Sequence, residues 1–200
     1  MIDFWVSIGS TYSYLSVMRL RAVEDESGVA FRWRPFSVRA IMIEQKNIPF
    51  VGKPVKLAYM WRDIERRART RGFEPRLPAP YPLAEFDLAN RIAIVGEGER
   101  WCADYVRAAY RHWFHSSREP GSEPGLSDAL REIGQSPARV LEAAKSEAIG
   151  ERYKAATEEA KSLGVFGSPT FIVDGEVFWG DDRLEDAIGW HKRVAETGGR

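Results

Sequence analysis

The sequence has one cysteine, no net charge and no long apolar run, and each shortage excludes a class of protein. A lone Cys102 cannot form an internal disulfide or a two-cysteine redox motif. The 29 lysines and arginines equal the 29 aspartates and glutamates, so overall charge does not favour nucleic acid or an anionic membrane as a partner. No apolar run approaches the roughly 20 residues that would span a bilayer. We therefore expect neither a membrane protein nor a nucleic-acid-binding protein.

Signals for targeting, phosphate binding and metal binding are also missing. Ile2-Asp3-Phe4-Trp5 stands where a secretory signal would place a basic segment and then an apolar one, so we expect a cytoplasmic protein. The chain has no Gly-rich phosphate loop, no Gly-x-Ser-x-Gly elbow and no paired-cysteine metal motif. His112 and His115 have helical spacing, but no third ligand stands at a helpful distance along the chain. We expect no metal site.

What is present is the composition of one compact, soluble unit, with 200 residues of which 44% are hydrophobic. Residues 2–6 are rich in strand formers, and Gly9-Ser10-Thr11 then interrupts the pattern. The apolar spacing over residues 14–22 predicts a helix, and the alternation over 29–36 predicts a half-exposed strand. A right-handed crossover would make these two strands parallel neighbours.

Residues 37–163 have no comparable strand signal and several stretches with helical spacing. Apolar residues recur at this spacing over 57–68, 88–95 and 102–113. Ser136-Pro137 is typical of an N-cap followed by proline at the first helical position, and helix is expected from there to Gly164 with a break at Gly150. The middle of the chain is therefore predicted to be a helical lobe.

The last part returns to strands. Residues 170–173 and 176–179 are short β runs joined by Asp174-Gly175, which favours a tight hairpin, and Gly180-Asp181-Asp182 then offers a helix N-cap. The order βαβ, helical insert, ββα is that of an α/β thioredoxin-like fold. Residues 1–36 and 164–200 would form the thioredoxin-like domain, and 37–163 the inserted helical lobe.

In this fold the turn after the first strand faces the loop before the hairpin, so Ser10 should lie near Ser168-Pro169. Redox members carry Cys-x-x-Cys at that turn, where the helix N-terminus stabilises a thiolate. Here the four residues are Ser10-Thr11-Tyr12-Ser13, and disulfide exchange is excluded. A hydroxyl at a helix N-terminus suits an anion or a thiolate brought by a cofactor, although a serine at this place, taken alone, is more often a plain N-cap than a catalytic group.

Three segments, when taken together, resemble one family, the 2-hydroxychromene-2-carboxylate isomerases. They are residues 3–15, the run Val165-Phe166-Gly167-Ser168-Pro169-Thr170, and residues 178–184. Those enzymes group with the kappa-class glutathione transferases and the wider DsbA-like proteins. The run Lys56-Leu57-Ala58-Tyr59 is also similar, so the resemblance covers nearly the whole chain. Two departures are Thr11, where the family usually has proline, and Ser7, where many members have aspartate.

The resemblance implies glutathione as the cofactor. Ser10 would be the catalytic residue, donating a hydrogen bond to the glutathione thiolate. The main chain of Ser168, before a cis-proline at Pro169, would pair with the cysteinyl unit of glutathione. Asp181 and Asp182 match positions that hold the γ-glutamyl end, with Trp179 and Gly180 lining the same wall. An aspartate at this place would also cap the last helix whether or not glutathione binds.

For the second substrate the resemblance points to Asn47 and Tyr81, with Lys56 among the nearby cations. This lining would suit an anionic aromatic or electrophilic small molecule. The implied isomerisation is thiolate addition to an activated double bond, ring opening, rotation about the resulting single bond and elimination of glutathione. The setting would be the catabolism of aromatic compounds. The family also implies a homodimer, for which Trp113, Phe114 and Trp190 are expected to be exposed aromatics.

Alternatives remain open at this stage. A kappa-like glutathione transferase would release the conjugate that an isomerase eliminates. A non-catalytic DsbA-like protein would use the proline loop to hold an extended peptide. The arginines between residues 62 and 71 are interrupted by acidic residues, and a solvated helix face is the expected arrangement.

Overall fold

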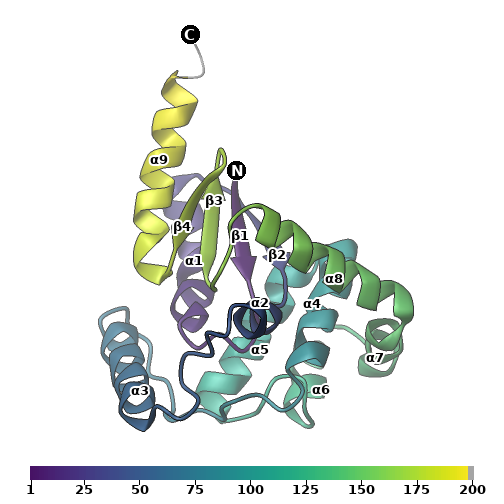
Figure 1. Ribbon diagram of the computed structural model, residues 1–200. Helices are drawn as coiled ribbons and strands as arrows, with labels where there is room; N and C mark the ends of the chain where they lie inside the picture. The colour runs from purple at the N-terminus through teal and green to yellow at the C-terminus, as the bar shows by residue number, and fades with distance from the viewer. Residues whose placement is uncertain (198–200) are drawn as a thin grey trace.

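The structure is a computed structural model that describes residues 1–197. A four-stranded mixed sheet lies in the upper half of the molecule as Figure 1 shows it. The strand order is β2-β1-β3-β4. The four strands are β1 (Ile2–Val6), β2 (Phe31–Pro35), β3 (Thr170–Val173) and β4 (Glu176–Trp179). β1 pairs with β2 in parallel and with β3 antiparallel. The βαβ opening and the closing hairpin are both confirmed, and so is the thioredoxin-like fold with a helical insertion.

The local sequence explains these elements. α1 (Ser13–Ser27) makes the crossover and ends at Gly28, whose φ of 70° is left-handed and therefore favours glycine. β2 alternates between buried and exposed positions, as a strand with one solvated face should. In the hairpin turn Asp174 and Gly175 have φ of 49° and 80°, and this pair of positive values defines the tight turn that the sequence predicts.

The helical insert lies below and to the right of the sheet in Figure 1. Its helices are α2 (Val38–Glu44), α3 (Pro54–Arg69), α4 (Phe86–Glu99), α5 (Cys102–Ser116), α6 (Gly125–Glu132), α7 (Pro137–Lys145) and α8 (Glu147–Ser162). The expected break at Gly150 is wrong, because the helix is interrupted at Ser146, between α7 and α8, and Gly150 lies inside α8. Ser146 begins the new helix by accepting a hydrogen bond from the Ile149 N–H. Ser136 caps α7 as predicted.

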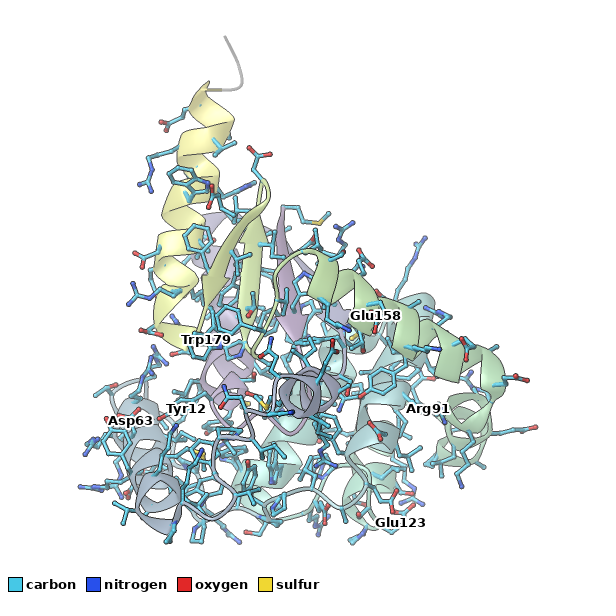
Figure 2. The ribbon with its side chains drawn as sticks, in the orientation of Figure 1. Tyr12, Asp63, Arg91, Glu123, Glu158 and Trp179 are labelled. Carbon is cyan, nitrogen blue, oxygen red and sulfur yellow. The ribbon has the colours of Figure 1, made fainter. Side chains whose placement is uncertain are left out.

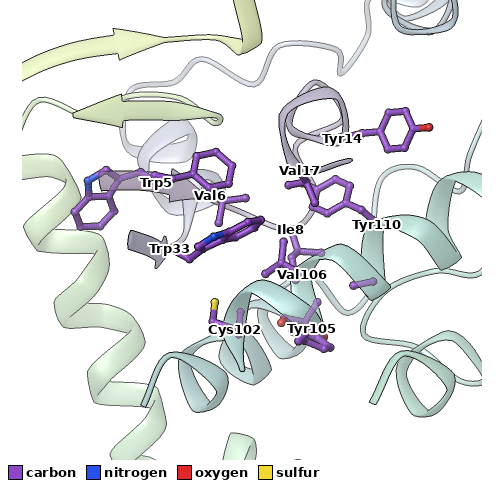
Figure 3. Close-up of a cluster of buried hydrophobic side chains, with 14 of the residues drawn as sticks. Trp5, Val6, Ile8, Tyr14, Val17, Trp33, Cys102, Tyr105, Val106 and Tyr110 are labelled. Carbon is purple, nitrogen blue, oxygen red and sulfur yellow. Dashed lines mark hydrogen bonds between the residues drawn. The ribbon is translucent and has the colours of Figure 1, made fainter. Parts of the chain in front are cut away.

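The core lies where the sheet meets α5 and α4. Figure 3 shows Trp5 and Trp33 of the sheet on one side and Tyr105 and Tyr110 of α5 on the other. Trp113 and Phe114 are completely buried, so their expected exposure is wrong. They continue the apolar stripe of α5, and the Trp113 indole donates a hydrogen bond to the Pro80 carbonyl at 2.7 Å. Their burial means that they are not available for an interface.

The C-terminal helix begins differently from the prediction. A 3₁₀ turn, η1 (Asp181–Arg183), precedes α9 (Leu184–Thr197), and no side chain caps this start by a hydrogen bond. The expected aspartate cap is therefore wrong. All four strands lie outside residues 37–163, and α2 to α8 lie inside this range. The division into two domains itself stays a prediction. Its last residues, 198–200, lie outside the described part of the chain. Within residues 1–197, the helices are too short or too polar to cross a bilayer.

Candidate functional site

The turn after β1 lies against the loop before β3, as the fold predicts. The Ser10 hydroxyl donates a hydrogen bond to the main-chain carbonyl of Ser168 at 2.5 Å. The Ser168 hydroxyl lies 2.9 Å from that of Ser13 and accepts a hydrogen bond from the Ser7 N–H, also at 2.9 Å. Pro169 follows a cis peptide bond, which confirms the predicted geometry. Three serines between the end of β1 and the start of α1 thus converge on the residue before Pro169.

Ser10 is not the N-cap of the first helix. α1 starts after Tyr12, whose side chain makes no capping bond, and the Ser10 hydroxyl points to Ser168. The carbonyls of Ser7 and Ser10 both accept from the Tyr110 hydroxyl, at 3.1 Å and 2.8 Å. Burial raises the pKa of Tyr110, so this phenol stays a donor at all physiological pH values. The Ser10 side chain therefore has no capping role, and its main-chain carbonyl is held by the Tyr110 hydroxyl.

α4 fixes the same turn from a second direction. Asn90 is completely buried, accepts from the Ile8 N–H at 2.8 Å and donates to the Ile8 carbonyl at 2.8 Å. Gly9 has φ of 118°, and a Cβ there would lie 2.5 Å from the Phe86 ring, so only glycine fits. Sequence reasoning missed Asn90, although an amide within the apolar stripe of a helix is a signal for a buried hydrogen bond.

α3 forms the neighbouring wall. The Thr11 hydroxyl contacts the Met60 sulfur at 2.9 Å, and the Tyr12 hydroxyl donates to Asp63 at 3.1 Å. Figure 2 labels Tyr12 and Asp63 in this region between α1 and α3. Burial and the Asp63 carboxylate both raise the pKa of Tyr12. The Thr11 hydroxyl is thus used to contact α3.

Tyr81 and Lys56, two of the three predicted substrate residues, both lie against the Phe50 ring. The Tyr81 ring lies edge-on to Phe50 with centroids 6.1 Å apart, and the Lys56 ammonium lies 5.8 Å from the same Phe50 ring. Trp61 adds a further aromatic edge 6.0 Å from Tyr81. Asn47 is exposed in the loop after α2. This aromatic surface with an adjacent cation lies beside α3.

Trp179 and Gly180 flank the Pro169 loop. The Gly180 N–H donates to the Pro169 carbonyl at 2.9 Å. The exposed Trp179 indole, labelled in Figure 2, packs on Gly167 so closely that a Cβ there would overlap it. Phe166 lies against Trp179 with centroids 4.8 Å apart. The two predicted wall residues are therefore adjacent to Ser168.

The two aspartates of the last turn differ in their surroundings. The side chain of Asp181 is fully buried and bonded to three arginines, whereas that of Asp182 is 55% exposed and pairs with Arg183 at 3.0 Å. Burial works against ionisation of Asp182, but the hydrogen bond from Arg183, a main-chain hydrogen bond and the charges of Arg183 and Arg67 together outweigh it and lower the pKa of Asp182. Asp182 is thus the carboxylate that a cationic group from solvent can reach.

The remaining candidates are placed away from this site. Cys102 is buried, and burial raises its thiol pKa. His112 bonds Glu132 and His115 bonds the Tyr14 hydroxyl, each at 2.9 Å, so the two histidines have separate partners. A pocket of about 560 Å³ lies between α2, α4 and α8 and contains none of the predicted site residues.

Fold and site together define a thioredoxin-fold protein in which serines occupy the place of the redox cysteines. The model of the DSBA-like thioredoxin domain matches residues 1–187, and the chain belongs to that family. It is 27% identical over 186 residues to a 2-hydroxychromene-2-carboxylate isomerase of Sphingobium xenophagum, covering 92% of this chain and 94% of that protein.

Two further comparisons agree with this placement. Glutathione S-transferase kappa 1 of Caenorhabditis elegans is 25% identical over 198 residues, with 92% and 87% of the two chains covered. A solved 2-hydroxychromene-2-carboxylate isomerase superposes with a TM-score of 0.86 at 26% identity, over 99% of this chain and 97% of that one. The relatives are enzymes, an isomerase and a transferase.

Proposed function

We propose that this protein is a glutathione-dependent cis-trans isomerase of the 2-hydroxychromene-2-carboxylate type, active in aromatic-compound catabolism. The observation that carries the proposal is the 2.5 Å contact between the Ser10 hydroxyl and the Ser168 carbonyl, in a turn without cysteine. The names of the relatives supply the class of reaction. A reduced cytoplasm, rich in glutathione, is the compartment that this chemistry requires.

The residues present fit glutathione, which is a short peptide carrying a thiol. Ser10 offers a hydroxyl donor at the N-terminal end of α1, and the adjacent Ser168 offers main-chain groups to a peptide. The Ser10 hydroxyl and the Ser168 carbonyl are in contact. When the thiol of a cysteinyl unit binds at Ser10, the peptide groups of that unit therefore lie beside the Ser168 main chain. The Ser10 hydroxyl rotates from the Ser168 carbonyl to the sulfur when the ligand arrives.

When bound, glutathione supplies a thiolate that adds to an activated double bond and is eliminated after rotation, so it is regenerated at each turnover. Ser10 stabilises the negative charge on that sulfur by a charge-assisted hydrogen bond, and the N-terminal end of α1 adds its partial positive charge. Tyr110 keeps the Ser10 backbone in place through both carbonyls of the turn. None of these residues forms a covalent bond to the substrate.

The second substrate is assigned to the aromatic surface around Phe50. Tyr81 and Trp61 supply flat apolar contact, and the Lys56 ammonium attracts a carboxylate. An aromatic ring bearing a carboxylate matches both features. Asn47 completes the predicted set as a hydrogen-bonding group of the loop before α3. We also propose that the protein works as a homodimer, which sedimentation analysis can test.

The test is a calorimetric titration of the purified protein with reduced glutathione, followed by conversion of a 2-hydroxychromene-2-carboxylate. Ser10→Ala should still bind glutathione but turn over about 10- to 100-fold more slowly, because one hydrogen bond to a charged group is lost. Ser162→Ala, an exposed serine at the end of α8, is the matched control and should match the wild-type rate. Absence of saturable glutathione binding by the unmodified protein would overturn the proposal.

The kappa relative favours one second function, a transferase that conjugates electrophiles to glutathione. Analysis of the product separates the two, because a transferase releases a thioether and an isomerase returns free glutathione. A peptide-binding role without catalysis predicts that Ser10→Ala changes nothing and that glutathione has no saturable effect.

A further inference from the structure

The side chain of Arg39 leaves the first turn of α2 and crosses to the proline-rich loop before α4, which carries Tyr81. Its Nη2 donates a hydrogen bond to the main-chain carbonyl of Leu83, two residues after Tyr81, at 2.9 Å. Its guanidinium lies over the face of the Phe86 ring, 4.0 Å from the ring centroid. Leu83 and Phe86 are both buried, so these two contacts hold the positive charge at a defined place.

The Phe86 ring links Arg39 to the serine turn. A Cβ at Gly9 would lie 2.5 Å from the Cδ2 and Cε2 atoms of this ring, so the ring packs directly on the residue before Ser10. The charge of Arg39 also acts on Tyr81, because burial raises the pKa of Tyr81 and the nearby guanidinium works against that rise. Arg39 is thus one ring away from the serine turn and close to the Tyr81 side of the aromatic surface.

Arg39 makes no ion pair within residues 1–197, and its two contacts there are the Leu83 carbonyl and the Phe86 ring. One of its N–H groups is used on Leu83, and a guanidinium carries five, so donors remain for a ligand. Glu119 accepts from the Ala84 N–H, at the other end of the peptide group whose carbonyl binds Arg39, so this carboxylate occupies none of those donors. An arginine held in this way matches a carboxylate that comes from outside the protein.

The other charges of this region are balanced or exposed to water. The neighbouring pocket between α2, α4 and α8 is lined by three acidic and three basic side chains, which are Glu85, Asp87, Glu158, Arg91, Lys145 and Lys154. Lys56, the cation beside Phe50, is exposed, whereas Arg39 is partly buried. Water and salt screen an exposed ammonium more than a partly buried guanidinium. Arg39 is therefore the cation best placed to fix a carboxylate near Tyr81.

We propose that Arg39 binds the carboxylate of the second substrate and so makes the site selective for an anionic aromatic molecule over a neutral one. The inference rests on the proposed function, from which the substrate comes. Lys56 then attracts the anion from a distance, and Arg39 fixes its orientation through the planar guanidinium fork. Because Arg39 lies close to Tyr81 and to the serine turn, a carboxylate bound there keeps the rest of a small molecule within reach of the thiolate proposed at Ser10.

The experiment compares two flat bicyclic probes of similar shape by calorimetry, the anion 2-naphthoate and the neutral 2-naphthamide. The unmodified protein should bind naphthoate at least about tenfold more tightly than naphthamide. Arg39→Gln should remove most of this preference by weakening naphthoate alone. Arg39→Lys keeps the charge but loses the fork, and it should lose part of the preference. Arg91→Gln removes the same charge from the neighbouring pocket, so it is the matched control and should keep the preference.

Turnover gives a second readout. A carboxylate that is held equally in the substrate and in the transition state contributes to binding and not to the chemical step. Arg39→Gln should therefore raise the KM for 2-hydroxychromene-2-carboxylate by about tenfold or more and change kcat by less than about threefold. An arginine that only supported the serine turn would lower kcat instead.

Each other outcome overturns the inference in a recognisable way. Equal affinity of the unmodified protein for both probes, or binding of neither, removes the carboxylate site. Equal weakening of both probes by Arg39→Gln shows that the side chain only holds the proline-rich loop in place. Loss of the preference in Arg91→Gln or Lys56→Gln, with Arg39→Gln unchanged, assigns the carboxylate to one of those cations.

Failure of the proposed function is distinguishable from failure of this inference. In that case the protein binds no glutathione, while the preference for naphthoate and its loss in Arg39→Gln remain. If Arg39→Gln does not fold, Arg39→Lys replaces it in the comparison, and a preference equal to that of the unmodified protein then overturns the inference.

Discussion

At the scale of single residues, Asp181 is the buried charge on which the C-terminal turn depends. Asp181→Ala would leave three guanidinium groups without their shared partner, so we expect a loss of about 3–5 kcal/mol in the free energy of unfolding. Asp182→Ala removes an exposed carboxylate and should change it by less than about 1 kcal/mol. Urea denaturation of both variants measures the difference. Similar small losses would show that the arginines tolerate separation.

Cys102 provides a second test at this scale. Because burial raises the pKa of its thiol, the native protein holds little thiolate at mildly alkaline pH. We expect no reaction with a chromogenic thiol reagent in the native state and one equivalent of reaction after denaturation, since the chain has a single cysteine. Fast labelling of the folded protein would mean that α5 opens readily near its start.

The sequence predicted that Ser10 and Ser168 would lie together, but it did not predict the partners of Asp181. The two serines follow from the fold, because a given fold brings fixed positions of its turns together. Arg67 and Arg71, which contact Asp181, lie more than 100 positions before it in the sequence, and Arg19 lies 162 positions before it. Arg67 does stand three residues after the buried Ile64, on the inner face of α3, but this spacing does not say which distant residue it contacts.

At the scale of elements, capping decides where α7 ends and α8 begins. The Ser146 hydroxyl donates to the Ala143 carbonyl at 2.7 Å and accepts from the Ile149 N–H at 3.3 Å, so it serves both helices. Ser146→Ala should lower the free energy of unfolding by about 1 kcal/mol. Ser162→Ala, within the last turn of α8, should be neutral or slightly stabilising because alanine favours helix. Thermal denaturation compares the two, and equal effects would refute the capping role.

Among the helices of the insert, the long ones were predictable and the shortest ones were not. α3, α4 and α5 each have 14 to 16 residues and therefore show several apolar repeats. α2 and α6 have seven and eight residues, too few for a period of 3.6 to be recognised. Gly150 was expected to break a helix, but α8 packs against α4 and retains it. Packing outweighed the weak helix propensity of one glycine.

At the scale of the whole molecule, the histidines set the first response to acid. All three have a pKa below their ordinary 6.5, mainly because of burial, and Arg111 adds repulsion at His115. The unfolded chain then binds more protons than the folded one, so the free energy of unfolding should fall as pH drops through about 6.5. Urea midpoints between about pH 7.5 and 5.5 measure this. His115→Gln keeps an acceptor for Tyr14 and should make the slope shallower, whereas a flat wild-type profile would contradict the prediction.

The sequence by itself determined the architecture, the absence of disulfide chemistry and the position of the serine turn. These depend on periodicity, turn residues and the count of one cysteine, all of which are local or compositional. Tertiary structure alone decided which charges meet. It placed Arg67 and Arg71 on Asp181, Asn90 against the Ile8 backbone and Trp113 in the core, because each contact joins segments whose approach is fixed by packing and not by neighbouring residues.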